Sequence, residues 1–466
     1  MFKRLRLKNF KGWEDTGTLR MAPISLLFGA NSSGKSSIGQ FLMMLKQTVE
    51  SSDRKAVFNP GGRNDAVHLG SYREMVFRRD PEKAIAFEYE WAPTEAVRFR
   101  EPMSGQEYSG DHLGFEGAVG LGNGDRQTLV LHRLNYRLSR GSEACVEVGM
   151  QRRPDPGAHT EYYRLEARNY RVKRKGNRTW YPVTPVRFYG FPDEVLAYHQ
   201  NVDFVRDLNL QHERLFRSVF YLGPLRTKAE RLYSWTGMEP ESVGYAGENT
   251  VAAILAARGR RISLGPRRPR RLFEEIIALK LREMGLIEAF SVNAISSDRQ
   301  EYEVKVRTRG AGEWVDLPDV GFGISQVLPV LVQCFHAPPG SIIIMEQPEI
   351  HLHPSAQSAL ADVMIDAIRA REEGGDRNIQ LIIETHSEHF LRRLQRRIAE
   401  ERVPGDMVSA YFADITKSPA TLNPLEIDDF GNIRNWPENF FGDEMADITG
   451  QAKAAVKKRM RERTGG

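Results

Sequence analysis

Short runs of consecutive apolar residues recur along the chain, and polar residues or glycine follow each of them. Runs of this length that include β-branched residues predict buried strands. The runs are Ile24–Phe28, Ser341–Met345 and Ile379–Ile383. After the first run, apolar residues recur at helical spacing, at Ile38, Phe41, Leu42 and Leu45. A buried strand followed directly by a helix is therefore predicted near the start of the chain.

Elsewhere the pattern alternates. Residues 5–13 alternate between charged and apolar side chains, which predicts an edge-like strand that runs into a turn at Gly12. Between residues 85 and 188, short alternating runs are separated by turn-rich gaps without a heptad repeat, so we expect a β-rich insertion and no coiled coil. Helices are predicted over Val251–Arg258, Leu272–Met284 and Val327–Cys334.

These patterns divide the chain into an N-terminal lobe (1–80), a β-rich insertion (81–219), a C-terminal lobe (220–400) and a C-terminal accessory domain with a basic tail (401–466). Composition adds little to this division. The chain has 466 residues, of which 41% are hydrophobic and 27% charged, as in ordinary globular proteins. The net charge of +5 permits nucleic-acid contact without requiring it.

The compartment follows from cysteines and apolar runs. Cys145 and Cys334 are far apart in sequence, so neither a disulfide framework nor a zinc cluster is expected. We therefore expect a reducing compartment. No apolar run approaches the roughly 20 residues of a membrane helix. We therefore expect a cytoplasmic protein without a membrane partner.

Residues 29–37 fit the pattern G-x-x-x-x-G-K-[ST] of a phosphate-binding loop, or P-loop. Glycines let the backbone N–H groups turn toward phosphate oxygens, and the following helix N-terminus adds partial positive charge. Lys35 can then reach the β- and γ-phosphates, and the Ser36 hydroxyl can ligate Mg²⁺. The residues expected to bind the nucleotide here are Gly29, Ala30, Asn31, Ser32, Ser33, Gly34, Lys35, Ser36 and Ser37.

A carboxylate follows the second apolar run. Glu346 ends this predicted strand, where an acid in a P-loop ATPase holds Mg²⁺ or its water, so Glu346 is a predicted metal ligand. His351 and His353 could suggest zinc, but no third ligand accompanies them and Pro354 begins a helix, so we do not favour a zinc site.

Two further segments could contact phosphate. His386 follows the third apolar run and could reach a γ-phosphate; a lone histidine is more often structural, but the neighbouring motifs favour the phosphate role. Gly323, Ser325 and Gln326 precede the helix predicted over Val327–Cys334, where free N–H groups could bind an anion. Taken alone, a serine N-cap explains that pattern equally well.

Taken together, these stretches resemble the ABC-type ATPase heads of the RecF, SMC, Rad50 and OLD families. The resemblance covers roughly residues 1–50 and 220–400, and the order of motifs is the same. It implies an α/β fold: an ABC-type P-loop ATPase head, here with a β-rich insertion and a small C-terminal extension. It also implies that Asn9 and Lys11 lie near the adenine and phosphates. Residues 427–441 look like a C-terminal domain of unknown function found on a bacterial subfamily of these ATPases.

By the same resemblance, Gly321, Gly323, Ser325 and Gln326 match the signature that binds the γ-phosphate held by the opposite subunit. The predicted cofactors are ATP and Mg²⁺, with Ser36 and Glu346 on the metal. The predicted catalytic residues are Glu346, Gln347, Glu349 and His386. Such proteins often occur in DNA repair or phage defence beside a separate effector.

The sequence departs from the pattern at the catalytic position. Most ABC-type heads have a catalytic glutamate directly after the metal-binding acid, whereas Gln347 stands there in this chain. Glutamine cannot accept a proton but can orient water, so either Gln347 or Glu349 directs the attacking water. Residues 68–71 lie in the region of the lid glutamine and contain none. Asp428 and Asp429 would point to opposite faces of a strand, so no nuclease site is expected.

The expected function is an ATP-dependent switch that dimerises on ATP and controls a DNA-directed or effector partner, in phage defence or DNA maintenance. One alternative is a RecF-like DNA-repair ATPase, and another is a scaffold that binds ATP and restrains a separate nuclease or toxin. Seven arginines between Arg258 and Arg271 make a predicted flexible basic segment for DNA, unless it is a solvated loop.

Overall fold

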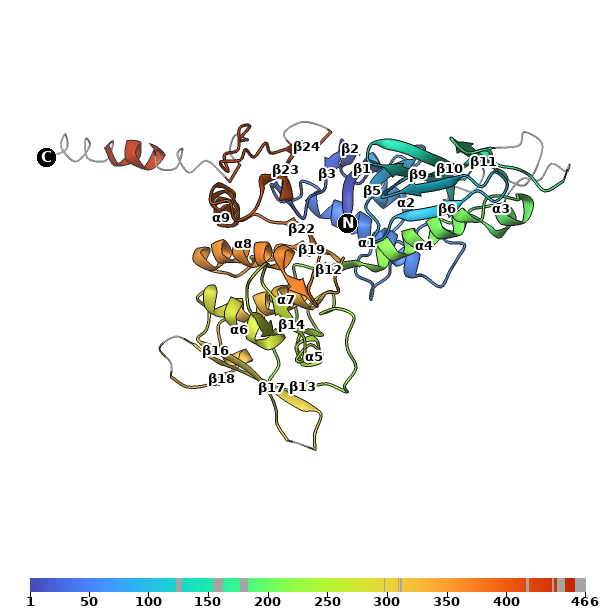
Figure 1. Ribbon diagram of the computed structural model, residues 1–466. Helices are drawn as coiled ribbons and strands as arrows, with labels where there is room; N and C mark the ends of the chain where they lie inside the picture. The colour runs from blue at the N-terminus through green and yellow to red at the C-terminus, as the bar shows by residue number, and fades with distance from the viewer. Residues whose placement is uncertain are drawn as a thin grey trace.

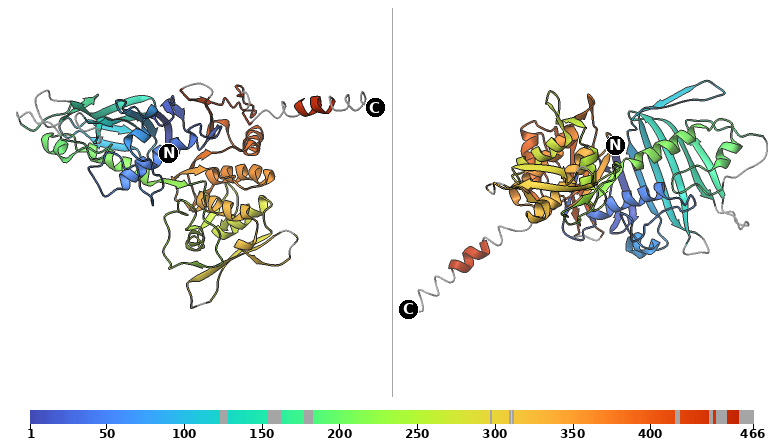
Figure 2. Two further views of the ribbon diagram at one scale, coloured as in Figure 1. Left: turned by 180° about the vertical axis from the view of Figure 1, so that it is seen from behind. Right: turned by 90° about the horizontal axis from the view of Figure 1, so that it is seen from below.

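The computed structural model describes residues 1–122, 128–153, 162–176, 183–296, 298–308, 310, 312–415, 419–437, 440–441 and 449–456. Two sheets lie on either side of helix α1 (Lys35–Glu50), and a mostly helical region extends from the far side of one of them (Figures 1 and 2).

The sheet that contains the three apolar runs has the strand order β12-β19-β22-β4-β23-β24. Neighbours from β12 to β23 are parallel, and β24 pairs antiparallel with β23. Its strands are β4 (Ile24–Gly29), β12 (Val219–Leu222), β19 (Ile342–Glu346), β22 (Gln380–Glu384), β23 (Val408–Asp414) and β24 (Thr421–Pro424). Because parallel strands are covered on both faces, their sequences are apolar without alternation. This P-loop sheet confirms the predicted α/β class.

Strand alternation assigns side chains to the two faces of this core sheet. Ile342, Ile344 and Ile382 pack in the cluster that contains α1, whereas Ile343 and Met345 pack in the cluster on the opposite face. Side chains two residues further along continue each series. The residues at 346 and 384 are therefore on the α1 side.

The opposite face of the core sheet is covered by helices. Residues of all of them belong to the second apolar cluster. They are α5 (Thr250–Ala256), α6 (Phe273–Glu283), α7 (Phe322–His336), α8 (Pro354–Arg369) and α9 (Glu388–Ala399). Beyond them lie β13 (Tyr233–Ser234), β16 (Ala289–Ala294), β17 (Glu301–Arg307) and β18 (Val315–Asp316), with a short 3₁₀ helix at Leu317–Asp319.

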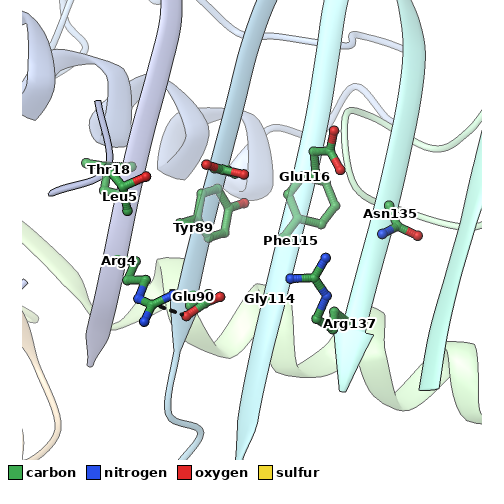
Figure 3. A pocket seen from close by; sticks show the side chains of 11 residues that line it. Arg4, Leu5, Thr18, Tyr89, Glu90, Gly114, Phe115, Glu116, Asn135 and Arg137 are labelled. Atoms are coloured by element: carbon green, nitrogen blue, oxygen red, sulfur yellow. Dashed lines mark ion pairs between the residues drawn. The ribbon is translucent and has the colours of Figure 1, made fainter. Parts of the chain in front are cut away.

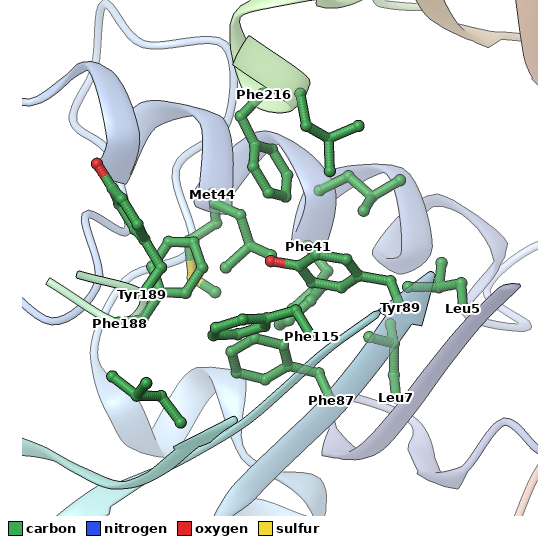
Figure 4. Packing of buried hydrophobic residues seen from close by; sticks show 14 of the residues in the cluster. Leu5, Leu7, Phe41, Met44, Phe87, Tyr89, Phe115, Phe188, Tyr189 and Phe216 are labelled. Atoms are coloured by element: carbon green, nitrogen blue, oxygen red, sulfur yellow. The ribbon is translucent and has the colours of Figure 1, made fainter. Parts of the chain in front are cut away.

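The second large sheet is antiparallel and has the order β11-β10-β9-β8-β5-β1-β2, with β3 paired to β1. Its strands are β1 (Phe2–Phe10), β2 (Trp13–Asp15), β3 (Leu19–Arg20), β5 (Ile85–Trp91), β8 (His112–Leu121), β9 (Leu129–Arg140), β10 (Glu143–Arg153) and β11 (Tyr162–Arg168). One face packs on α1 and α4 (Phe204–Arg217), where Phe41 contacts Phe87 and Tyr89 contacts Phe216 (Figure 4). Smaller elements are β6 (Val97–Arg100), β7 (Glu107–Gly110), α2 (Tyr72–Met75), α3 (Asp193–Tyr198) and 3₁₀ helices at Phe77–Arg79 and Gly405–Met407.

A histidine lies in the middle of this aromatic core. His212 of α4 is fully buried, and its ring nitrogens are 2.9 Å from the Tyr89 hydroxyl and 3.0 Å from the Tyr136 hydroxyl. The Tyr136 hydroxyl donates to the Tyr189 carbonyl, so it accepts from His212 Nδ1–H, and His212 Nε2 accepts from Tyr89. Burial holds the pKa of His212 well below its usual value, so the ring is neutral.

The other face of the antiparallel sheet is polar and has charged side chains from β1, β5, β8 and β9 (Figure 3). Arg4 pairs with Glu90 at 3.6 Å, and Arg133 pairs with Glu116 at 3.1 Å. Such exposed cross-strand pairs each contribute little to stability. The alternation of apolar and charged residues in this region therefore reflects one buried face and one face turned to solvent.

Two sequence expectations about elements were wrong. The first strand is not at an edge, because β1 pairs with β5 on one side and with β2 and β3 on the other. The arginine-rich segment is not an irregular flexible stretch, because β14 (Arg261–Ser263) and β15 (Arg270–Leu272) pair within it and continue to β20 (Arg371–Glu372) and β21 (Gly375–Asp376). The boundary predicted at residue 400 precedes β23, which is a strand of the core sheet.

Candidate functional site

The P-loop connects β4 to α1, and two of its glycines have backbone angles that other residues rarely adopt. Gly29 has a φ of 142° and Gly34 a φ of 88°. A Cβ at Gly29 would lie 2.6 Å from the Ala413 carbonyl oxygen of the adjacent strand β23. A Cβ at Gly34 would lie 3.2 Å from the ring of Trp13. Gly29 therefore needs glycine for space as well as for conformation, and Gly34 needs it for its positive φ.

Trp13 supports the loop from below. Its indole is fully buried, and Nε1 donates to the Gly34 carbonyl at 3.1 Å and to Ser37 Oγ at 2.9 Å. Ala30, Asn31 and Ser32 are exposed at the rim of the loop. The loop thus has a buried, hydrogen-bonded floor and an open rim at which a phosphate chain can enter.

Lys35 lies inside the loop, with only 3% of its surface exposed. Its ammonium group donates to the carbonyls of Gly29 at 3.0 Å and Ala30 at 2.7 Å. Burial lowers the pKa of Lys35, and the carboxylates of Glu384 and Glu346 oppose that shift. A buried ammonium group surrounded by loop carbonyls is placed to transfer its hydrogen bonds to phosphate oxygens.

Two carboxylates face the loop from adjacent strands. Glu346 at the end of β19 is in register with Glu384 at the end of β22, and both are on the α1 face. Each is 8% exposed. Glu384 Oε1 is 3.8 Å from Lys35 Nζ.

Both carboxylates have raised pKa values. Burial, and then the charge of Glu384, raises the pKa of Glu346 to about 7, while the Tyr221 hydroxyl, which donates to Glu346 Oε1 at 2.8 Å, opposes this shift. Burial also raises the pKa of Glu384, opposed by Ser36 and Lys35. Hydroxyl and carboxylate oxygens are the ligands that Mg²⁺ prefers, so Ser36, Glu346 and Glu384 fit this ion.

Gln347 has a left-handed backbone, with a φ of 45°. Its N–H donates to the Glu384 carbonyl at 2.8 Å. Arg226 Nη2 donates to the carbonyls of Glu346 at 3.2 Å and Gln347 at 3.4 Å. Burial lowers the pKa of Arg226 to about 10. The backbone after the acidic strand is thus fixed from both sides, at a residue whose conformation would otherwise be disfavoured.

Glu349 and His386 are connected by a hydrogen bond. Glu349 Oε1 accepts a hydrogen bond from the His386 backbone N–H at 2.8 Å, and burial raises the pKa of Glu349. His386 Nε2 is buried and has no hydrogen-bond partner among the residues that the structure describes. Burial and the nearby Lys35 charge lower the pKa of His386, so its ring is neutral near pH 7.

Of Asn9 and Lys11, the two residues near the first turn that were predicted to contact the nucleotide, only Lys11 has its side chain close to the P-loop and Glu346. The Lys11 ammonium group donates to Gln40 Oε1 of α1 and is close enough to Glu346 to feel its charge, which partly offsets the lowering of the Lys11 pKa by burial. Asn9 donates its side-chain amide to the Ala84 carbonyl at 2.9 Å, before β5. Lys11 therefore joins the site, whereas the amide of Asn9 is engaged with the antiparallel sheet.

The signature residues lie in the first turns of α7, which begins at Phe322. Ser325 is half-buried, and its hydroxyl donates to the Phe322 carbonyl at 2.8 Å. A Cβ at Gly323 would lie 2.8 Å from the His351 carbonyl oxygen, so this glycine allows close packing on the loop after β19. Within the described ranges, no hydrogen bond or ion pair joins Ser325 or Gln326 to residues 29–37.

The sequence reasoning missed four residues: Trp13, Tyr221, Arg226 and Glu384. Glu384 had a detectable signal, because it ends a buried strand as Glu346 does and occupies the same parity relative to the apolar run. Arg226 follows a predicted strand and turn, but nothing local predicts its burial. Trp13 and Tyr221 act through contacts between distant segments, which a single sequence does not reveal.

The C-terminal segment packs directly behind the loop. Phe28, the residue before Gly29, has ring contacts with Phe440 at 5.3 Å and Phe441 at 6.1 Å between centroids. Trp436 packs on Phe440, and Arg392 of α9 lies 4.5 Å over the Trp436 ring. The basic tail predicted at the very C-terminus lies largely outside the described residues.

Arginines of the predicted DNA-binding segment divide into two groups. Arg258 pairs with Glu274 at 3.3 Å, and Arg260 pairs with Glu372 at 2.8 Å. Arg261, Arg267, Arg270 and Arg271 are exposed on or beside the hairpin β14–β15. No helix in the described ranges is long and apolar enough to cross a membrane.

Two family models match parts of the chain. Residues 209–392 match the family model described as "AAA domain, putative AbiEii toxin, Type IV TA system", and residues 403–451 match "Protein of unknown function (DUF3696)". The P-loop lies before the first match in sequence, and strands of the antiparallel sheet lie between the two. A search of curated proteins finds no match.

Among solved structures, the chain is similar to SMC head domains. An SMC head bound to the C-winged helix domain of ScpA gives a TM-score of 0.41 at 10% identity, covering 91% of this chain and 98% of that one. The SMC head domain from Thermotoga maritima gives 0.38 at 11% identity, covering 91% and 99%. The Pyrococcus furiosus Smc head, with an extended coiled coil and bound to the C-terminal domain of ScpA, gives 0.37 at 11%, covering 91% and 96%.

Proposed function

We propose that this chain, whose residues 209–392 match the model of an AAA domain, binds and hydrolyses ATP with Mg²⁺ and uses the cycle as a switch. The observation that carries the proposal is the buried Lys35 ammonium group inside the loop, with Glu346 and Glu384 opposite on one face of the core sheet. This arrangement supports binding of a triphosphate between a cation and a metal-binding edge.

Each residue then has a role that its surroundings support. Lys35 and the loop N–H groups hold the phosphates, and Lys11 adds a second positive charge near Glu346. Ser36 and Glu346 would hold Mg²⁺, which neutralises phosphate charge when bound. His386 Nε2 can donate to the γ-phosphate, because it is buried without a partner in the described part of the chain.

The attacking water has two candidate partners. Gln347 follows Glu346 directly, and its fixed left-handed backbone supports a positioning role. Glu349 is the alternative base, although one of its oxygens already accepts from His386 N–H. Glutamine lacks a basic group, which supports slow turnover and long-lived ATP-bound states.

The second level of the proposal is ATP-dependent dimerisation. Ser325 and Gln326 lie in the first turns of α7, and no hydrogen bond or ion pair in the described ranges joins them to residues 29–37. Their proposed role is to contact the nucleotide of a second copy. The dimer would act on a separate effector protein or on DNA through the exposed arginines of β14–β15, in phage defence or DNA maintenance. A scaffold that restrains a nuclease or toxin is the second candidate, and Gln347 favours it because such a scaffold needs stable ATP binding.

Lys35→Met tests the proposal because methionine keeps the length of the side chain and removes its charge. A hydrogen bond to a charged group contributes roughly 1.5–3 kcal/mol, so we expect ATP affinity to fall by roughly 10–150-fold. Nucleotide affinity is measured by fluorescence or calorimetry on the full chain. An unchanged affinity and turnover would refute the P-loop assignment.

A further inference from the structure

Glu384 is a carboxylate of the proposed nucleotide site to which the sequence motifs assign no role. It ends β22, the strand between the P-loop strand β4 and the acidic strand β19. Register places it beside Glu346, and strand alternation turns both side chains toward α1. It is therefore at the centre of the site.

Its two oxygens differ in their surroundings. Oε1 is 3.8 Å from Lys35 Nζ, whereas Oε2 is buried and has no hydrogen-bond partner among the described residues. An unpaired buried carboxylate oxygen is unfavourable and needs a donor or a cation. Glu346 is constrained differently, since Tyr221 already donates to its Oε1.

The charges around the P-loop also favour a divalent cation beside Glu384. Lys11 and Lys35 supply two positive charges near the loop, and Glu346 and Glu384 face them. An ATP triphosphate brought against both carboxylates would be repelled unless a divalent cation lay between them. Such a cation would also satisfy Glu384 Oε2.

We infer that Glu384 is a second carboxylate of the divalent-cation site, acting with Glu346 and Ser36, and that it makes ATP binding strongly dependent on Mg²⁺. This inference rests on the proposed function, because it needs ATP at the P-loop. It assigns to Glu384 two effects with opposite signs. It opposes metal-free nucleotide and favours the metal-bound form.

The test is Glu384→Gln, which keeps shape and removes charge. ATP affinity of the full chain is measured across free Mg²⁺ concentrations, with excess chelator as the metal-free limit. We expect metal-free ATP to bind more tightly than to the parent and the half-saturating Mg²⁺ concentration to rise by about 10–100-fold, as for other groups beside a metal. Electron paramagnetic resonance of Mn²⁺ with ATP should show weaker metal binding in the same variant.

Controls separate the outcomes. Glu101→Gln removes a carboxylate in the turn between β6 and β7, hydrogen-bonded to Ser104 and Asn201, and should leave both affinities unchanged. Glu384→Asp keeps the negative charge but moves it away from the site, because the side chain is one methylene shorter. It should raise the half-saturating Mg²⁺ concentration even if Glu384→Gln does not fold. An unchanged Mg²⁺ midpoint with tighter metal-free binding would make Glu384 only a counter-ion of Lys35 and overturn the inference. A parent chain that binds no ATP with or without Mg²⁺ would instead refute the proposed function.

Discussion

Replacing Gln347 with glycine separates its chemical role from its structural one. Gln347 has a φ of 45°, a left-handed conformation that costs a non-glycine residue roughly 1–2 kcal/mol. Glycine removes that strain but makes the unfolded chain more flexible, at about 0.4–1 kcal/mol. The backbone contacts with Glu384 and Arg226 involve only main-chain atoms of residue 347 and can persist. The free energy of unfolding should therefore stay the same or rise, by at most about 1.6 kcal/mol.

Turnover should respond very differently. If the Gln347 side chain orients the attacking water, its loss should lower kcat by about 10²-fold, which is the effect of misplacing a reacting group. ATP affinity should stay within a few fold, because the contacts of Lys35 do not involve residue 347. The measurements are steady-state ATP hydrolysis, nucleotide affinity and urea unfolding of the same preparations.

A matched control has the same backbone change outside the site. Glu373 lies in the turn between β20 and β21, is exposed and has a φ of 50°. Glu373→Gly should leave turnover, affinity and stability near the parental values. If Gln347→Gly hydrolyses ATP as fast as Glu373→Gly, the water is not positioned by Gln347. Glu349→Gln would then be the variant expected to lose 10²–10⁴-fold in turnover with ATP still bound.

Two other predictions concern assembly and stability. Ser325→Arg should leave ATP binding intact but prevent ATP-dependent dimerisation, because it places a long cation at the proposed contact; a light-scattering increase with ATP equal to that of the parent would contradict the assignment. The neutral His212 should make the folded protein less stable as pH falls below about 6.5, since its folded pKa is depressed and the unfolded chain takes up the proton, with a slope of up to about 1.4 kcal/mol per pH unit from this residue. His212→Phe should remove that part of the slope in urea unfolding at pH 5.5 and 7.5, and an identical pH dependence in both proteins would refute the neutral-histidine assignment.

The residues that the sequence could predict are those whose role depends on neighbours in the chain. Ile24–Phe28, Gly34 and Lys35 form a strand, turn and helix that local pattern alone indicates. Glu346 is likewise predictable as a strand-end carboxylate from its place at the end of an apolar run. Helix α7 begins five residues earlier than the predicted Val327, because the glycines at 321 and 323 suggested a turn where the structure has the first turn of the helix.

The features that the sequence could not predict depend on pairing between distant segments. Residues 5–13 alternate as an edge strand does, yet β1 is paired on both sides because β3 and β5 return to it. Trp13 contacts Gly34 through the fold, and Tyr221 contacts Glu346 across 125 positions of sequence. Local propensity carries no information on which segments become neighbours.

The positions in sequence of the two strands beside β4 also determine when the core sheet can form during synthesis. β4 ends at Gly29, but the strands on either side of it are Gln380–Glu384 and Val408–Asp414. At ribosomal rates of about 5–20 residues per second, roughly 20 to 70 s pass before the first of these partners is made. Until then the edges of β4 have no partner from the core sheet, and the Gly29 carbonyl side lacks its β23 neighbour. A nascent or truncated chain that lacks β22 and β23 should therefore not form the P-loop, so ATP binding reports that nearly the whole chain has been made and folded.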